Sequence, residues 1–301
     1  MNFYEKIDKD CSISGLDIGH ATLINNQGLI LDSKITGVEP LAKADKLFID
    51  NKTVWLGVGK YDTEYNKVEK QNYMNFLYGL LALSTTTTHN LICVGLPLSQ
   101  YRENKEQLIN KIMSDNKKIL YINDMERTII IDDVFVAPEG IATLDDKFEG
   151  IVCDIGGRTS DVALVINEYG KRKIINPISI PLGTIDLYTD FINKINSRYS
   201  LNLKIDDAAR ILRSGLTLKG KKQEINFALE MQREFTESLI SDLQRNYNLE
   251  INNISLTGGG AEIVYNQLRN ALGEGVTIQD NSILANAKAF YEIGLSVFSE
   301  D

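Results

Sequence analysis

The residues best suited to chemistry are two aspartates, each of which follows an apolar run and precedes a glycine by two positions. Asp17 stands in GLDIGHATLI and Asp154 in VCDIGGRTSDVALV, far apart in the chain. An Asp-x-Gly sequence between apolar stretches predicts a strand, a tight turn and a second strand. Glycine lets backbone N–H groups approach an anion closely, and carboxylates bind hydrated Mg²⁺. Each segment is therefore a candidate phosphate and metal site, although an isolated Asp-Gly turn is more often only a hairpin.

A third glycine cluster lies late in the chain. The segment 254–264 reads ISLTGGGAEIV, which is an apolar strand, three glycines and the start of a helical pattern. A backbone without side chains at this point can lie directly against a nucleoside. The three motifs in this order are far more specific than any one of them alone.

Strands and helices alternate along the rest of the chain, which indicates a mixed α/β protein. The apolar run at 91–97 predicts a buried strand that ends at a proline. Ser99 is a candidate N-cap for the helix that follows. Helices are predicted at 73–86, 99–113, 182–198, 205–213, 224–247 and 283–298.

Length and composition set bounds on the architecture. With 301 residues and 43 % hydrophobic content, the chain can bury a large core in about two domains. The most apolar stretch, 76–83, is too short to span a bilayer, and the charged N-terminal segment is unlike a secretory signal. We therefore expect a cytoplasmic protein without a membrane contact.

Charge and cysteine content exclude several classes of function. The net charge of −9 argues against a direct nucleic-acid surface. The basic cluster at 219–222 is interpreted as a solvated loop. Cys11, Cys93 and Cys153 are widely separated, so neither a disulfide framework nor a zinc site is predicted.

The ordered glycine motifs resemble those of the actin, Hsp70 and sugar-kinase superfamily, whose two related domains hold ATP in a central cleft. Within it, the chain is most similar to the bacterial plasmid-segregation actins of the ParM or StbA group. PISIPLGTIDLYTDF at 177–191 and NSILANAKAFYEIG at 281–294 carry this narrower likeness. The resemblance implies an actin-like, ribonuclease H-like α/β fold of duplicated domains with a nucleotide cleft.

The resemblance also implies a domain organisation. Domain I is expected at 1–155 and 283–301, with a small inserted subdomain at about 38–71, and domain II at 156–282, with an outer subdomain at about 185–250.

Most of the expected nucleotide contacts fall in the three glycine loops. The residues implied are Asp17, Gly19, His20, Ala21, Gly156, Gly157, Arg158, Thr159, Gly258, Gly259 and Gly260. Asp17, Asp154 and Asp161 are the expected Mg²⁺ residues, and Asp161 has the alternative role of bracing the turn. Base and ribose contacts are expected from 206–214 or 230–237, without a named residue.

Catalysis is expected in FVAPEGIATL at 135–144, together with Asp154. Pro138 predicts a helix start, which places Glu139 in the first turn. The resemblance implies that Glu139 orients the attacking water. The alternative role is stabilisation of the helix N-terminus.

The first loop departs from the family pattern at two positions. The family usually has a serine and a phosphate-binding lysine where this chain has His20 and Ile24. A missing lysine removes a countercharge to the phosphates. Arg158 is the candidate replacement, unless it faces solvent. His20 either donates to a phosphate or only completes the turn.

The function implied by the resemblance is Mg²⁺-dependent hydrolysis of ATP, or of GTP, coupled to head-to-tail filament formation. Plasmid DNA would then be segregated through a DNA-binding adaptor of the ParR type. Two alternatives share the fold: an exopolyphosphatase-like phosphohydrolase or small-molecule kinase, and a scaffold of the FtsA type. The C-terminal sequence LSVFSED lacks the basic residues of a membrane anchor, which argues against the scaffold.

Overall fold

The structure is a computed structural model that describes residues 11–62 and 64–299. The described chain forms two compact units. The first unit runs to Asp146 and resumes at Asp280, and the second unit covers Lys147–Gln279. Among the described residues, no helix combines the length and apolar character needed to cross a membrane.

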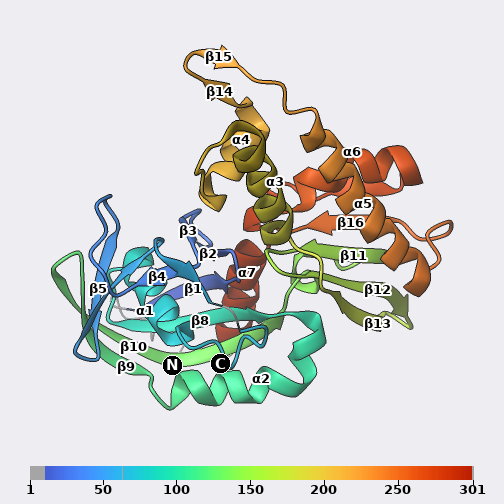
Figure 1. Cartoon of the computed structure of the whole chain (residues 1–301). Helices are drawn as coiled ribbons and strands as arrows, with labels where there is room; N and C mark the ends of the chain where they lie inside the picture. Colours follow the sequence, from blue (N-terminus) through green and yellow to red (C-terminus); the bar gives the residue numbers. More distant parts are fainter. Residues whose placement is uncertain (1–10, 63, 300–301) are drawn as a thin grey trace. The chain divides into compact units, whose positions relative to one another are not determined.

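A mixed sheet forms the framework of the first unit (Figure 1). Its described strands lie in the order β3-β2-β1-β8-β10-β9-β5-β6-β4-β7. β1 is antiparallel to β2 and parallel to β8, which is parallel to β10. The strands are β1 (Cys11–Ile18), β2 (Thr22–Asn25), β3 (Ile30–Asp32), β4 (Lys34–Thr36), β5 (Asp45–Ile49), β6 (Lys52–Leu56), β7 (Lys60–Tyr61), β8 (His89–Leu96), β9 (Lys117–Ile122) and β10 (Met125–Pro138).

Helices cover both faces of this sheet. The helices are α1 (Tyr73–Ser84), α2 (Leu98–Met113) and α7 (Ala285–Ser299). Leu16 and Ile18 of β1 share a core with α1 and α2. The opposite face receives α7, whose Phe290 packs against Cys93. Gly15 permits this approach, because a Cβ atom there would lie 2.2 Å from the carbonyl oxygen of Ala287.

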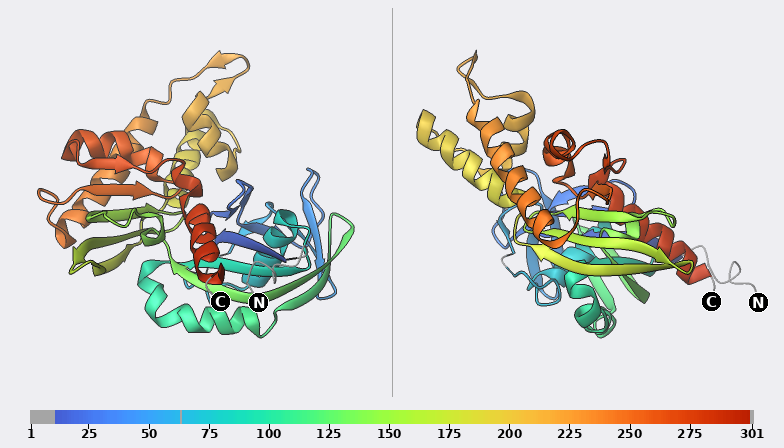
Figure 2. Two further views of the ribbon diagram at one scale, coloured as in Figure 1. Left: turned by 180° about the vertical axis from the view of Figure 1, so that it is seen from behind. Right: turned by 90° about the vertical axis from the view of Figure 1, so that its right-hand side faces the viewer.

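The second unit has a sheet in the order β13-β12-β11-β16-β17 (Figure 2). β11, β12 and β13 are antiparallel neighbours, and β16 and β17 continue the sheet in parallel. Cys153 and Ile155 of β11 pack against α5 and α6. The elements are β11 (Gly150–Ile155), β12 (Ser160–Glu168), β13 (Lys171–Ile180), α5 (Phe227–Asn246), β16 (Ile254–Thr257), α6 (Ala261–Leu272) and β17 (Val276–Ile278).

A separate helical cluster is inserted between β13 and α5. It contains α3 (Thr184–Tyr199), α4 (Ala208–Ser214), and the hairpin of β14 (Thr217–Leu218) and β15 (Lys221–Lys222). Phe191, Ile195, Ile211 and Phe227 form its own small core. The Phe191 and Phe227 rings lie 6.0 Å apart, centroid to centroid.

The two units repeat one arrangement, which confirms the expected duplicated α/β fold. Each contains three antiparallel strands, then a helix, a parallel strand, a second helix and another parallel strand. α1 and α5 are equivalent in this series, as are α2 and α6. The insertions differ: β4 to β7 precede α1 in the first unit, whereas α3, α4, β14 and β15 precede α5 in the second.

Most of the predicted elements are confirmed, and two local predictions are wrong. Pro138 does not start a helix; it is the last residue of β10, paired with Leu96 of β8. Glu139 continues this contact through its backbone N–H, 2.9 Å from the Leu96 carbonyl oxygen. The chain then turns at Gly140, whose φ is +70°, into a single 3₁₀ turn at Ile141–Thr143. Ser99 is not an N-cap either, because α2 starts one residue before it.

Candidate functional site

The first glycine loop is the turn between β1 and β2, as the sequence predicts. Asp17 lies near the end of β1, directly opposite Ile24 in β2. Gly19 is confined within the turn, since a Cβ atom there would lie 2.7 Å from the carbonyl oxygen of Thr22. His20 is buried, with Nε2 3.1 Å from the carbonyl oxygen of Glu64. The carbonyl oxygen of Ala21 accepts a backbone hydrogen bond from Ser33.

A buried lysine brings two of the expected site residues together. The ammonium group of Lys67 lies 3.4 Å from Asp17 Oδ1 and forms an ion pair with Glu139 Oε1. Burial lowers the pKa of Lys67, but attraction to Glu139 and Asp17 more than offsets it, so the pKa stands above its ordinary value. Lys67 is therefore charged over the whole physiological range of pH.

A second buried lysine supports the same turn. The ammonium group of Lys70 donates to the carbonyl oxygen of Gly19 and to Ser33 Oγ, each at 2.8 Å. Burial, followed by repulsion from Lys67, lowers the pKa of Lys70 to about 7. Lys70 thus holds the glycine turn by hydrogen bonds and changes its charge near neutral pH.

Neither lysine was identified from the sequence, which places both in a polar segment ahead of an apolar helix. Ile24, where the family pattern has lysine, is buried. The available signal was the spacing: Lys67 and Lys70 lie six and three residues before Tyr73, the first residue of the buried helix α1. Lysines so close to a fully buried helix start must find partners inside the protein.

The second glycine loop brings two aspartates to one face of a sheet. Asp154 of β11 is directly opposite Asp161 of β12. Directly opposed residues in antiparallel strands project from the same face. Thr159 Oγ1 donates to Asp161 Oδ2 at 3.0 Å, and the Gly156 N–H donates to the Thr159 carbonyl oxygen at 2.8 Å. The loop therefore presents carboxylate and hydroxyl oxygens close together.

The third glycine motif joins this loop. Gly258 lies against Asp154, since a Cβ atom there would be 2.3 Å from Asp154 Oδ1. The Gly260 N–H donates to the carbonyl oxygen of Ile155 at 2.9 Å. Gly259 is exposed between them. The turn from β16 into α6 thus lies beside the end of β11, as the sequence motif requires.

The start of α3 fixes the far side of the second loop. The N–H groups of Thr184 and Ile185 donate to the carbonyl oxygens of Gly156 and Gly157, at 3.1 and 2.8 Å. Arg158, the next loop residue, is half-buried. The second loop is therefore held by β12, α3 and the β16–α6 turn, all within the second unit.

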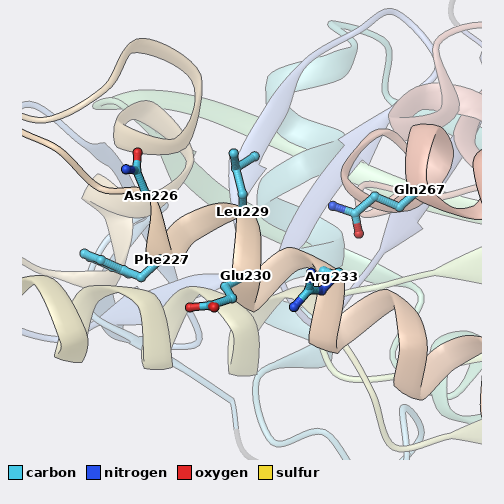
Figure 3. Close-up of a pocket in the computed structure, with 6 residues that line it drawn as sticks. All are labelled: Asn226, Phe227, Leu229, Glu230, Arg233 and Gln267. Carbon is cyan, nitrogen blue, oxygen red and sulfur yellow. The ribbon is translucent and has the colours of Figure 1, made fainter.

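A cavity of about 430 Å³ opens between α5 and α6 (Figure 3). Gln267 extends from α6 toward α5, and its buried side-chain oxygen has no hydrogen-bond partner among the described residues. Glu230 and Arg233 of α5 lie within the stretch expected to contact a base or ribose. The lining residues are Asn226, Phe227, Leu229, Glu230, Arg233 and Gln267.

The expected metal residues fit Mg²⁺ by donor type. Mg²⁺ prefers oxygen ligands and usually keeps several waters, so one or two carboxylates suffice. Asp154 and Asp161 supply such a pair in the second unit, and Asp17 is in the first. Among the described residues no group of three or more metal-ligating side chains is present. The carboxylate pair of the second unit therefore suits a mostly hydrated ion.

Two family models match the chain. The model of the actin like proteins N terminal domain matches residues 55–141. The model of the archaeal actin homologue MreB-like, C-terminal domain matches residues 152–270. Together they cover more than half of the chain. No curated protein is significantly similar to it in sequence.

Solved structures share the fold over nearly the whole chain. A ParM filament protein from Clostridium botulinum is 19% identical with a TM-score of 0.74, over 94% of this chain and 99% of the other. The archaeal actin homologue Ta0583 in complex with ADP is 15% identical with a TM-score of 0.80, over 93% and 98%. The apo pSK41 ParM protein is 18% identical with a TM-score of 0.68, over 97% and 100%.

The family models match separate parts of the two units, and these solved structures share the duplicated fold. The chain therefore belongs to the actin-like family of proteins.

Proposed function

We propose that the protein is a filament-forming ATPase that segregates plasmid DNA through a DNA-binding adaptor, hydrolysing ATP, or GTP, with Mg²⁺. One observation carries the nucleotide part of the proposal: the same carboxylate-glycine turn occurs at the equivalent hairpin of both units. A duplicated fold that keeps this turn in both copies is expected to use both on one ligand.

Each loop has a distinct proposed role. Backbone N–H groups at Gly19, His20 and Ala21, and at Gly157 and Thr159, bind phosphate oxygens, and Gly156 lets the backbone approach them closely. Asp154 and Asp161 hold the hydrated Mg²⁺ with Asp17, and Arg158 adds a positive charge. Bound Mg²⁺ would neutralise charge on the phosphates. Glu139 orients the attacking water.

The cavity between α5 and α6 is the proposed site of the base and ribose. Gln267 lies two turns beyond Gly260 on α6, which is about 10 Å along the helix axis. This separation matches the distance from the phosphates of a nucleotide to its base. Gln267 lines the cavity, and its side-chain amide carries both donor and acceptor groups that can pair with the edge of a base. Gly258, Gly259 and Gly260 then lie along the nucleoside.

Filament formation and plasmid segregation rest on the likeness to other proteins. Structures with this fold include a 15-stranded ParM filament and a filament of AlfA from a B. subtilis plasmid. A ParR-type adaptor would link such a filament to DNA, since the net charge of −9 disfavours direct DNA binding.

Light scattering and phosphate release, recorded together after addition of Mg-ATP, test the proposal. We expect scattering to rise and then to decay as phosphate appears, and a non-hydrolysable analogue to prevent the decay. Parallel runs with GTP give the base preference. Phosphate release without scattering would contradict filament formation and favour the exopolyphosphatase-like phosphohydrolase. If the protein bound no nucleotide at all, both the filament-forming ATPase and the nucleotide site would be contradicted.

A further inference from the structure

We propose that Lys67 is a positioning residue for hydrolysis, which holds the Glu139 carboxylate in place through a buried ion pair. The inference rests on the proposed function, because it concerns how Glu139 orients water. Lys67 acts from behind the site rather than on the ligand.

The side chain of Lys67 differs from those of the two carboxylates in its exposure to solvent. The Lys67 side chain is 1% exposed, whereas those of Asp17 and Glu139 are 15% and 10% exposed. The carboxylates therefore retain access to solvent and the ammonium group does not. Lys67 is accordingly distinct from the phosphate-binding lysine that the first loop lacks.

The backbone of Lys67 is fixed from the other side. Its N–H donates to Gln100 Oε1 at 3.0 Å, and Gln100 Nε2 donates to the carbonyl oxygen of Tyr65 at 3.1 Å. Gln100 is itself buried in α2. A side chain anchored in this way delivers its ammonium group to one place, so the contact to Glu139 restricts the orientation of that carboxylate.

The position of Glu139 in the chain leaves its side chain dependent on tertiary contacts such as the ion pair with Lys67. The residue follows β10 in a turn and not in a helix, so a helix dipole does not hold it. Its Cγ atom would be 2.9 Å from a Cβ atom at Gly95, which shows that the side chain leans over β8. Removing a buried partner leaves the other charge uncompensated. Loss of Lys67 would therefore weaken the hold on the Glu139 carboxylate and with it the orientation that the proposed hydrolysis needs.

The charged surroundings of this pair come from several elements. Lys70 and Asp62 precede α1, Tyr73 begins it, and Asp17 lies near the end of β1. Lys70 is buried and donates to the turn at Gly19. Lys67 is thus the cation that the structure places on Glu139.

The test compares Lys67→Met, Glu139→Gln and the double variant in the full chain. Nucleotide affinity is measured by titration with a fluorescent ATP analogue, and hydrolysis by single-turnover phosphate release. We expect Lys67→Met to keep the Kd within about threefold and to slow release by about 30- to 100-fold. The double variant should be no slower than Glu139→Gln alone, because both substitutions remove one function.

Lys118→Met is the matched control. Lys118 lies in the same unit and also forms ion pairs, but its partners are the exposed Asp50 and Asp115. Its release rate should stay close to that of the unmodified protein. Multiplicative losses in the double variant, or an affinity loss as large as the rate loss in Lys67→Met, would overturn the positioning role.

Measurements of stability test the coupling between Lys67 and Glu139 without relying on nucleotide binding or hydrolysis. Denaturant unfolding of the unmodified protein and these three variants of Lys67 and Glu139 should show that the double variant is no less stable than Lys67→Met, because Glu139→Gln removes the charge that Lys67 balances. If the double variant instead lost as much unfolding free energy as the two single variants together, the proposed coupling between Lys67 and Glu139 would be contradicted. If the unmodified protein binds no nucleotide, the proposed function fails while this comparison still decides whether Lys67 and Glu139 are coupled. If Lys67→Met does not fold, Lys67→Arg takes its place in the test. Because arginine keeps the positive charge, this variant should retain at least part of the release rate of the unmodified protein.

Discussion

The two hairpins are built alike but compensate their charges differently. In the first unit, Asp17 lies beside the buried ammonium group of Lys67, which also pairs with Glu139. In the second unit, Asp154 lies opposite a second carboxylate, Asp161, and against the backbone of Gly258. One backbone arrangement therefore supports two electrostatic designs.

This difference indicates a division of labour. A carboxylate that already shares an internal cation gains less from an added Mg²⁺ than a pair of carboxylates on one sheet face does. The second hairpin is thus better suited to hold a metal ion, whereas the first is linked through Lys67 to Glu139, the residue proposed to orient water.

The largest effect is expected for Glu139→Ala. Phosphate release should fall by about 100- to 1000-fold while nucleotide affinity is retained, because orientation of the attacking water is lost and the phosphate loops remain. Single-turnover release and nucleotide titration measure the two quantities. Glu106→Ala, an exposed residue of α2 in the same unit, is the control. Unchanged turnover would remove Glu139 from the mechanism and leave the first hairpin without a catalytic role.

Gly258→Ala tests the close packing that distinguishes the second hairpin. Gly258 has a φ of +83°, and the new Cβ would lie 2.3 Å from Asp154 Oδ1. We expect the free energy of unfolding to fall by about 2–3 kcal/mol in denaturant titrations. Gly220→Ala is matched, because Gly220 has a φ of +78° with open space around it. Its loss should be only about 1 kcal/mol, and equal losses would show that Gly258 is not crowded by Asp154.

Asp154→Ala and Asp17→Ala compare the two hairpins directly. Asp154→Ala should weaken Mg-nucleotide binding by roughly 10- to 100-fold, with a smaller effect when Mg²⁺ is removed. Asp17→Ala should have less effect on the Mg²⁺ dependence, since its carboxylate already shares Lys67. Nucleotide titrations at several Mg²⁺ concentrations measure this, with the exposed Asp190→Ala as control. A larger Mg²⁺ effect for Asp17→Ala would reverse the proposed division.

The elements predicted most securely from the sequence are those with local signals. Both hairpins, the strand and glycine turn before α6, and the long helices follow from short-range patterns of apolar residues and glycine. The wrong helix at Glu139 has a non-local cause. Pro138 fits a helix start, but pairing with β8 extends β10 through that residue, and Leu96 lies far away in the chain.

The buried lysines could not be placed by sequence for the same reason. Lys67 contacts residues from β1 and from the turn after β10, which only the sheet order brings together. Local polarity at 62–72 is typical of a surface loop, and nothing in that segment indicates partners outside it. The aspartates of the two hairpins can be recognised from the glycines next to them in the sequence. Lys67, which balances the charge of Asp17, has no such neighbouring motif.

The smallest effect, and the one most specific to the first hairpin, is expected for Lys70→Met. The folded-state pKa of Lys70 is about 7, against an ordinary value of 10.5. Between these values the unfolded chain binds more protons than the folded one, so the free energy of unfolding rises with pH, by about 1 kcal/mol per unit. Below pH 7 both states are protonated and this contribution is lost.

Lys70→Met should remove that slope, because methionine keeps the length of the side chain without a titrating group. Urea unfolding at pH 7, 8 and 9 measures the slope, and the exposed Lys60→Met serves as control. If the free energy of unfolding rose with pH equally in the unmodified protein and in Lys70→Met, the amino group of Lys70 would stay charged in the folded protein. The first hairpin would then hold two charged lysines instead of one, and its glycine turn would itself be positively charged and suited to bind phosphate directly.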